Sequence, residues 1–268
     1  MKRKNLGFLV FACAVALFLI LCSLLARAEE PRPAGYFLQS GPFSIETVKS
    51  NWHDNSRNRD VPVKIYYPEG RGPFPIIIFS HGLGGSREGY QYLGQHWWAS
   101  HGYVSVHLTH IGSDTSVWTG NKHPLEAMTD AAHDIHNDVN RPKDVSFAID
   151  QLADMNKNDP VFKGHLALDR IGIAGHSFGG YTTLAVAGET FIVPAGSNWN
   201  FGDPRVKAAI AMSAPASKRD AVTLDRMYGS IKIPCFIMTG TKDNSPIGET
   251  KAEDRRIPFD HLSAAPTY

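Results

Sequence analysis

The stretch AGHSFGG around Ser177 constrains the fold of this chain more than any other segment. It joins an apolar run at 170–175, which reads as a β-strand, to a run of small residues at 178–188, which reads as a helix. Glycines at positions 175 and 179 let the backbone turn sharply and pass close to its neighbours. A strand, a sharp turn and a helix in this order predict an α/β protein with a parallel sheet.

The rest of the chain supports this prediction, because predicted strands and helices alternate along it. Continuous apolar runs indicate strands buried on both faces, and two alternating segments joined by a polar connection indicate a hairpin. Predicted strands lie at 44–50, 61–67, 75–80, 103–110, 170–175, 206–212 and 234–240. Helices are predicted over 87–102 and 140–155, whereas 111–138 is a long polar stretch.

The N-terminus has the pattern of a signal peptide. Three basic residues (Lys2, Arg3 and Lys4) precede an apolar run at 6–25, and Ala26-Arg27-Ala28 is a small-residue cleavage signature. We therefore expect residues 1–28 to be a signal peptide of a secreted or periplasmic protein. The alternative is an uncleaved membrane anchor, since the run is long enough to span a bilayer. Residues 29–268 are then one domain, long enough to bury a core without disulfides or metals.

The charge of this domain excludes some partners. Removing the four basic residues of the signal from the total of 27 leaves 23, against 26 acidic residues. Such a balance gives no footprint for nucleic acid and no polybasic patch for a membrane surface. Cys235 is the one cysteine left, so no internal disulfide is expected, and its apolar surroundings predict a buried side chain.

Ser177 is the candidate nucleophile, because a strained turn between a strand and a helix exposes a serine hydroxyl above the sheet edge. The backbone N–H of Phe178 is the first candidate donor to an oxyanion. The second is the N–H of Leu83, in the glycine-rich stretch SHGLGG that follows a predicted strand. In the same stretch His81 is predicted to be structural. A plain glycine-rich turn is the alternative interpretation of both segments.

Asp243 is the candidate acid. It follows the predicted strand 234–240, at the carboxyl edge where the sites of open α/β sheets collect. The alternative is a turn residue, since the sequence DNSP favours turns.

The motifs GHSFGG, SHGLGG and TGTKD, in this order, resemble the α/β-hydrolase superfamily. They look most like the branch of platelet-activating-factor acetylhydrolases and predicted dienelactone hydrolases, over roughly residues 40–268. The resemblance implies an α/β-hydrolase fold, a small-molecule ester substrate with a short acyl or acetyl group, an acyl-enzyme on Ser177, and no metal or organic cofactor. In the animal acetylhydrolases the acid follows the strand directly after the nucleophile helix. Here that place, 211–217, has no carboxylate, so Asp243 fits the common superfamily position better.

The resemblance also implies a histidine base after the acid, and the sequence contains no clear candidate for it. His261 is the one histidine after Asp243, and the segment between them is too short and polar for a helix, a strand and a loop. An apolar strand is expected to begin near Tyr268. We therefore expect the last strand, the histidine loop and the last helix to lie beyond residue 268, with His261 as the alternative base. A chain without its base is expected to be inactive.

Two rival functions stay open on the sequence. One is a binding module in which the triad has lapsed, and the other is a hydrolase of amide or carbon–carbon bonds. The stretch HDIHND at 133–138 could suggest a metal site but reads better as a solvated segment. Trp118 could either line an acyl pocket or pack down its own loop.

Overall fold

The computed structural model describes residues 39–193, 196–248 and 250–268. The predicted signal peptide, residues 1–28, lies outside this part. Residues Ser40–Tyr268 form one unit with its own core. Among the described residues, no helix has the length and apolar character needed to cross a bilayer.

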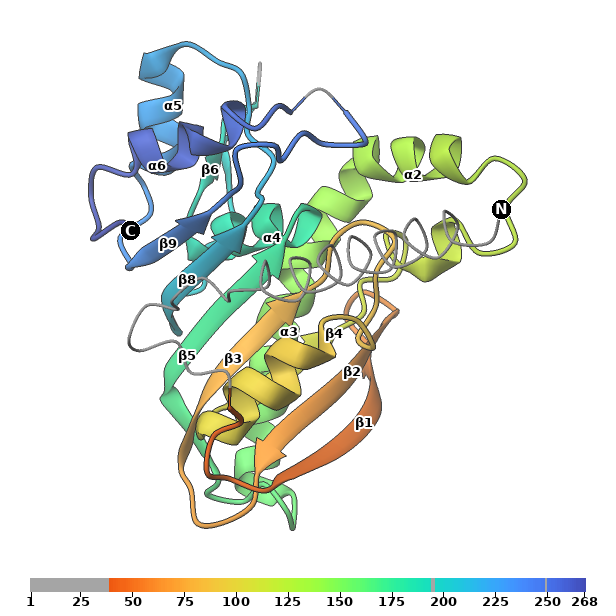
Figure 1. Ribbon diagram of the computed structural model, residues 1–268, viewed down its shortest axis with the longest axis vertical. Coiled ribbons are helices and arrows are strands. Elements are labelled where there is room, and N and C mark those ends of the chain that lie inside the picture. The colour runs from red at the N-terminus through yellow and green to blue at the C-terminus, as the bar shows by residue number, and fades with distance from the viewer. Residues whose placement is uncertain (1–38, 194–195, 249) are drawn as a thin grey trace, which may run out of the picture. The chain divides into compact units, whose positions relative to one another are not determined.

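A mostly parallel sheet forms the centre of this unit (Figure 1). Its strands are β1 (Ile45–Asp54), β2 (Arg59–Pro68), β3 (Phe74–Ser80), β4 (Val104–Leu108), β5 (Leu166–His176), β8 (Val206–Met212) and β9 (Cys235–Met238). Their order across the sheet is β1-β2-β4-β3-β5-β8-β9. The pairs β1–β2 and β2–β4 are antiparallel, and all pairs from β4 to β9 are parallel. Each strand predicted from the sequence is present.

Helices flank the sheet on both faces (Figure 1). α3 (Ile135–Asn158) and α4 (Phe178–Ala187) cover one face, and a π-helical segment, η1 (Tyr92–Trp98), continues through η2 (Ala99–His101) on the other. Gly102 ends η2 in the left-handed conformation, as the sequence predicts. The predicted mostly parallel sheet with flanking helices is therefore confirmed.

The interior of α3 follows the predicted helix 140–155, but α3 begins earlier than predicted, at Ile135. The four apolar residues at its predicted positions are fully buried: Val145, Ala148, Ile149 and Leu152. The first turn is held by Asp134, whose side chain accepts a hydrogen bond from the N–H of His136 at 2.9 Å. The stretch 111–138 is thus partly helical, since α2 (Pro124–His133) and the start of α3 lie in it. No residue of α2 is buried, and its few apolar residues lie within a predominantly polar stretch of the sequence.

Several short elements complete the unit: η3 (Thr115–Val117), β6 (Thr190–Phe191), β7 (Trp199–Asn200), α5 (Ala221–Tyr228), η4 (Asp254–Arg256) and α6 (Ile257–His261). β6 and β7 pair as a small hairpin, and α6 packs against α5. The end of the described chain lies along β9, where the N–H of Tyr268 donates to the carbonyl of Cys235 at 3.0 Å. Thr267 forms an isolated parallel β-bridge with Cys235 there. Cys235 itself is buried, as predicted.

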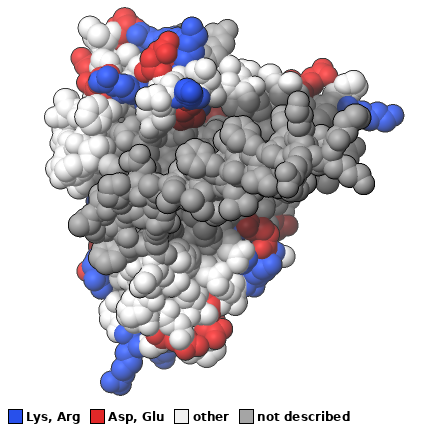
Figure 2. All heavy atoms as spheres, in the orientation of Figure 1, with Lys and Arg blue, Asp and Glu red and all other residues white. Residues whose placement is uncertain are grey.

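Charged side chains on the described part of the face in Figure 2 are mixed, with Lys and Arg lying beside Asp and Glu. They do not gather into a basic patch on this part of the surface.

Candidate active site

Ser177 occupies the turn between β5 and α4 with φ 54° and ψ −118°. An L-residue rarely adopts a positive φ, so the turn is strained. The N–H of Ser177 donates to the carbonyl of Met212 in β8 at 2.9 Å, which holds the turn at the carboxyl edge of the sheet. The strained serine turn that the motif predicts is therefore present, with Ser177 half-buried at the wall of a pocket.

Gly175 and Gly179, on either side of Ser177, are required because other backbone atoms approach them closely. A Cβ added at Gly179 would lie 1.9 Å from the carbonyl oxygen of Ser80, and one at Gly175 would lie 2.1 Å from the carbonyl oxygen of Gly179. The missing Cβ atoms let α4 start directly against the end of β3.

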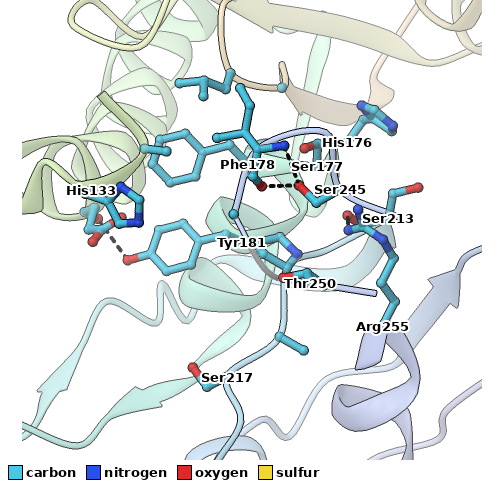
Figure 3. A pocket seen from close by; sticks show the side chains of 18 of the residues that line it. His133, His176, Ser177, Phe178, Tyr181, Ser213, Ser217, Ser245, Thr250 and Arg255 are labelled. Atoms are coloured by element: carbon cyan, nitrogen blue, oxygen red, sulfur yellow. Dashed lines mark hydrogen bonds between the residues drawn. The ribbon is translucent and has the colours of Figure 1, made fainter. Parts of the chain in front are cut away.

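A pocket of about 810 Å³ opens beside Ser177, and the four predicted site residues all line it: Leu83, Ser177, Phe178 and Asp243. Figure 3 shows Ser177 between Phe178, Tyr181 and His133 on one side and Ser213 and Arg255 on the other. Residues far apart in the sequence thus meet at one cavity, as expected for strands that end at a common edge.

Two backbone donors face this cavity without a partner. Phe178 is the first residue of α4, so its N–H has no acceptor within the helix. The N–H of Leu83 makes no hydrogen bond to any described residue, whereas Gly84 N–H donates to the carbonyl of Ser113 at 2.8 Å. The hydrogen bond of Gly84 therefore fixes the loop next to Leu83, while the N–H of Leu83 is left to donate to a ligand.

Backbone strain gathers at the same place. Of the four non-glycine residues with positive φ in the described chain, three line the pocket: Tyr90, Ser177 and Ser213. Each costs on the order of 1–3 kcal/mol, so the surrounding packing must hold them.

Asp243 follows β9, and its carboxylate is held from several sides. Thr239 Oγ1 donates to Oδ2 at 3.0 Å, and the buried Arg255 places Nε 3.2 Å from the same oxygen. Burial by itself would raise the pKa of Asp243, but hydrogen bonds from Ser213 and Thr239 and the charge of Arg255 lower it overall. The side chain is therefore an anion at neutral pH. Sequence reasoning missed Arg255, which lies in a polar stretch without periodicity.

Two histidines line the pocket, His133 and His176. His176 Nδ1 lies 2.7 Å from the hydroxyl of Tyr90. Burial lowers the pKa of His176, and the charge of Asp243 opposes part of this shift. Within the described chain, no histidine ring forms a hydrogen bond with the Ser177 hydroxyl or the Asp243 carboxylate.

His261 lies elsewhere. Its Nδ1 is 2.6 Å from Oδ1 of Asp225 on α5, and it does not line the pocket. The alternative prediction that His261 serves as the base is not supported by this position, because the packing of α6 on α5 directs its ring to Asp225.

The loop that carries Leu83 rests on a buried polar network. His81 is fully buried, and its Nε2 accepts from the N–H of His110 at 3.0 Å, so it is structural, as predicted. The guanidinium of Arg141 donates to Ser80 Oγ at 3.1 Å and also to the carbonyl of His81. The same group donates to Thr182 Oγ1 in α4 at 2.9 Å. One buried side chain thus ties the Leu83 loop to the helix that begins after Ser177.

The structure also shows the positions of Trp118, His133 and His136, whose roles the sequence left undecided. Trp118 Nε1 donates to the carbonyl of Gly84 at 2.8 Å and does not line the pocket, so Trp118 packs on the loop. His133 and His136 are exposed, and the described residues contain no group of three His, Cys, Asp or Glu side chains that could hold a metal ion.

Comparison with known proteins finds similarity to platelet-activating factor acetylhydrolases. Residues 58–136 match the family model "Platelet-activating factor acetylhydrolase, isoform II". The platelet-activating factor acetylhydrolase of Canis lupus familiaris is 26% identical over 76% of this chain and 46% of that protein. The protein of the same name from Bos taurus is 28% identical over 65% of this chain and 41% of its own length. The chain thus spans less than half the length of these relatives.

The fold has a solved counterpart. The crystal structure named "Putative Dienelactone Hydrolase" from Klebsiella pneumoniae subsp. pneumoniae MGH 78578 superposes with a TM-score of 0.58 at 16% identity, covering 84% of this chain and 85% of that one. The strand order, the strained serine turn and these similarities together show an α/β-hydrolase fold, and the chain resembles the branch of platelet-activating-factor acetylhydrolases and dienelactone hydrolases.

Proposed function

We propose that this protein is a serine hydrolase of carboxylic esters with Ser177 as the nucleophile. The observation that carries the proposal is the strained Ser177 facing a cavity in which the N–H groups of Leu83 and Phe178 are free of other acceptors. Such donors are the groups that stabilise a developing oxyanion. Proteins named acetylhydrolase and dienelactone hydrolase among the similar sequences and structures support an ester as the substrate.

The reaction follows from this arrangement. Ser177 Oγ attacks the ester carbonyl carbon as its proton passes to an imidazole base, and the carbonyl electron pair moves to the oxygen held by the Leu83 and Phe178 N–H groups. No histidine of the described residues is hydrogen-bonded to Ser177, so the residue that supplies this imidazole is not assigned. Collapse of this intermediate expels the alcohol, which takes the proton, and leaves an acyl group on Ser177. Water then attacks the acyl-enzyme and releases the carboxylic acid. The anionic Asp243 orients the imidazole and stabilises its cation.

Covalent labelling tests the nucleophile. We expect an alkyl fluorophosphonate to add one phosphonyl group to the chain at Ser177, found by peptide mass spectrometry, and to leave Ser177→Ala unlabelled. Ser245→Ala removes another serine of the same pocket and is the matched control, expected to label like the wild type. Labelling that persists in Ser177→Ala would refute the assignment.

Turnover separates the rival functions. A short-acyl nitrophenyl ester is expected to be cleaved faster than the anilide with the same acyl group, because the anilide has the poorer leaving group. Binding of the ester without labelling or turnover would favour the lapsed binding module, and preferred cleavage of the anilide would favour an amidase.

We also propose export of the protein, which depends on residues 1–28. N-terminal sequencing of the protein secreted by its host should begin at Glu29.

A further inference from the structure

Glu189 is a buried carboxyl group that the proposed reaction does not use. It follows α4, lines the pocket, and is 4% exposed. Its backbone N–H donates to the carbonyl of Leu184, but its carboxyl group makes no hydrogen bond or ion pair with any described residue. An unpaired polar group buried at a cavity wall is costly unless a ligand satisfies it.

The surroundings of Glu189 are aromatic. Tyr181 of α4 and Tyr228 of α5 line the same pocket as Glu189, and an ionised Glu189 would raise the pKa of both tyrosines. The ring of Tyr181 lies 5.3 Å from that of Phe191, which pairs in register with Trp199. We call Glu189 with these four aromatic residues the distal arm of the pocket.

The distal arm lies away from the nucleophile. Ser177 precedes the first turn of α4 and Glu189 follows its last, so the two residues are separated by on the order of 15 Å along the helix axis. Because both line one cavity, a ligand attacked at Ser177 can extend along α4 to Glu189. In Figure 3 the lining side chains run from Ser177 past Tyr181 to Ser217.

We propose that Glu189, as a neutral carboxylic acid, donates a hydrogen bond to an uncharged acceptor oxygen in the part of the substrate remote from the attacked ester carbonyl. This inference rests on the proposed function of Ser177. An isolated carboxylate without a cation beside it is too costly to bury, so the acid keeps its proton. Its O–H then needs an acceptor, and the described protein residues supply none.

The protonation of Glu189 supports this role. Burial raises its pKa to about 8, so the neutral form predominates at neutral pH. Burial also raises the pKa values of both tyrosines of the distal arm, so they keep their protons in this range. The other titratable side chains that line the pocket are Tyr90, His133, Asp138, His176, Asp243 and Arg255.

Matched probes can isolate the distal arm from the chemistry at Ser177. Three fluorophosphonates carry alkyl chains of the same length that end in a methyl, a methoxy or a trimethylammonium group. The set of three is made at several alkyl chain lengths. Because all three react with the same hydroxyl, the ratio of labelling rates between two probes cancels the pH dependence of Ser177. We expect the methoxy probe to react about 3- to 10-fold faster than the methyl probe near pH 6.5 at the best length. The ratio should fall towards 1 above about pH 9, where Glu189 loses its proton.

Two variants complete the experiment. Glu189→Gln keeps a donor without a titration, so its ratio should stay above 1 at both pH values. Glu189→Leu removes the donor, and its ratio should be 1 throughout. Should Glu189→Leu not fold, as judged by its melting curve, the loss of pH dependence in Glu189→Gln carries the test.

Two results would overturn the proposal. One is a wild-type ratio of 1 at every chain length. The other is a preference for the trimethylammonium probe that grows with pH, because a cation favours the ionised form of Glu189. If no probe labels Ser177, the proposed function fails separately. The same ratio is then measured from the dissociation constants of the methyl-ended and methoxy-ended alcohols, with the same expectation.

Discussion

At the scale of single residues, the candidate site has its nucleophile in place without a bound base. Ser177 is strained and faces the pocket, and Asp243 is held as an anion by Thr239 and Arg255. Neither group is hydrogen-bonded to a histidine of the described chain. A serine hydroxyl without a base reacts slowly, since its alkoxide form is scarcely populated at neutral pH.

Added imidazole should therefore speed the reaction of this chain with fluorophosphonate. A positioned base contributes about 10²–10⁴-fold, and a free one should recover a small part, on the order of 10-fold. The measurement is the labelling rate of Ser177 against imidazole concentration, with Ser177→Ala as the blank. If imidazole has no effect and His176→Ala abolishes labelling, His176 is the base and this prediction is wrong.

At the scale of elements, Arg141 of α3 joins three parts of the site. Its guanidinium donates to Ser80 at the end of β3, to Ser113 after β4 at 2.7 Å, and to Thr182 in α4. The side chain is fully buried, so each of these bonds is shielded from water. The position of Leu83 relative to Ser177 thus depends on a residue of another helix.

Replacing Arg141 by Met should destabilise the fold by on the order of 3–5 kcal/mol, because several buried acceptors lose a charged donor at once. Arg256→Met is the matched control, since its side chain is 67% exposed and pairs with Asp260 on the surface. It should change the free energy of unfolding by less than about 1 kcal/mol. Urea denaturation followed by circular dichroism measures both, and equal losses would contradict the role of Arg141.

The elements also show what the sequence pattern could and could not predict. Strands buried on both faces and the core positions of α3 were predictable, because burial imposes a run or a period on the residues. α2 and α5 were missed, since they are ten and eight residues long, which leaves little room for a helical period to show. Glu189 gave no signal, because its burial depends on rings from β6, β7 and α5.

At the scale of the whole molecule, Glu189 links stability to pH. In the folded protein it keeps its proton up to about pH 8, whereas its ordinary pKa is 4.5. Between these values the folded state binds the extra proton, so this group makes the fold less stable as pH rises. Below pH 4.5 the group is neutral in both states and has no effect of this kind.

Glu189→Gln should remove that contribution. The free energy of unfolding of the variant minus that of the wild type should increase by up to about 1.4 kcal/mol per pH unit between pH 5 and 8 and then level off. Urea titrations at several pH values provide the measurement, and Glu69→Gln, the same change at an exposed position, is the matched control. A difference that does not change with pH would show that Glu189 ionises normally in the folded protein.

The sequence by itself determined the order of the central strands along the chain, the helices α3 and α4, and the strained serine turn. These features are local, because hydrophobic periodicity and glycine spacing act over a few residues. Only the tertiary structure decided that His261 pairs with Asp225, that Trp118 packs on the Leu83 loop, and that Arg255 holds Asp243. These contacts join segments distant along the chain, so they depend on how the elements pack and leave no pattern in any one segment.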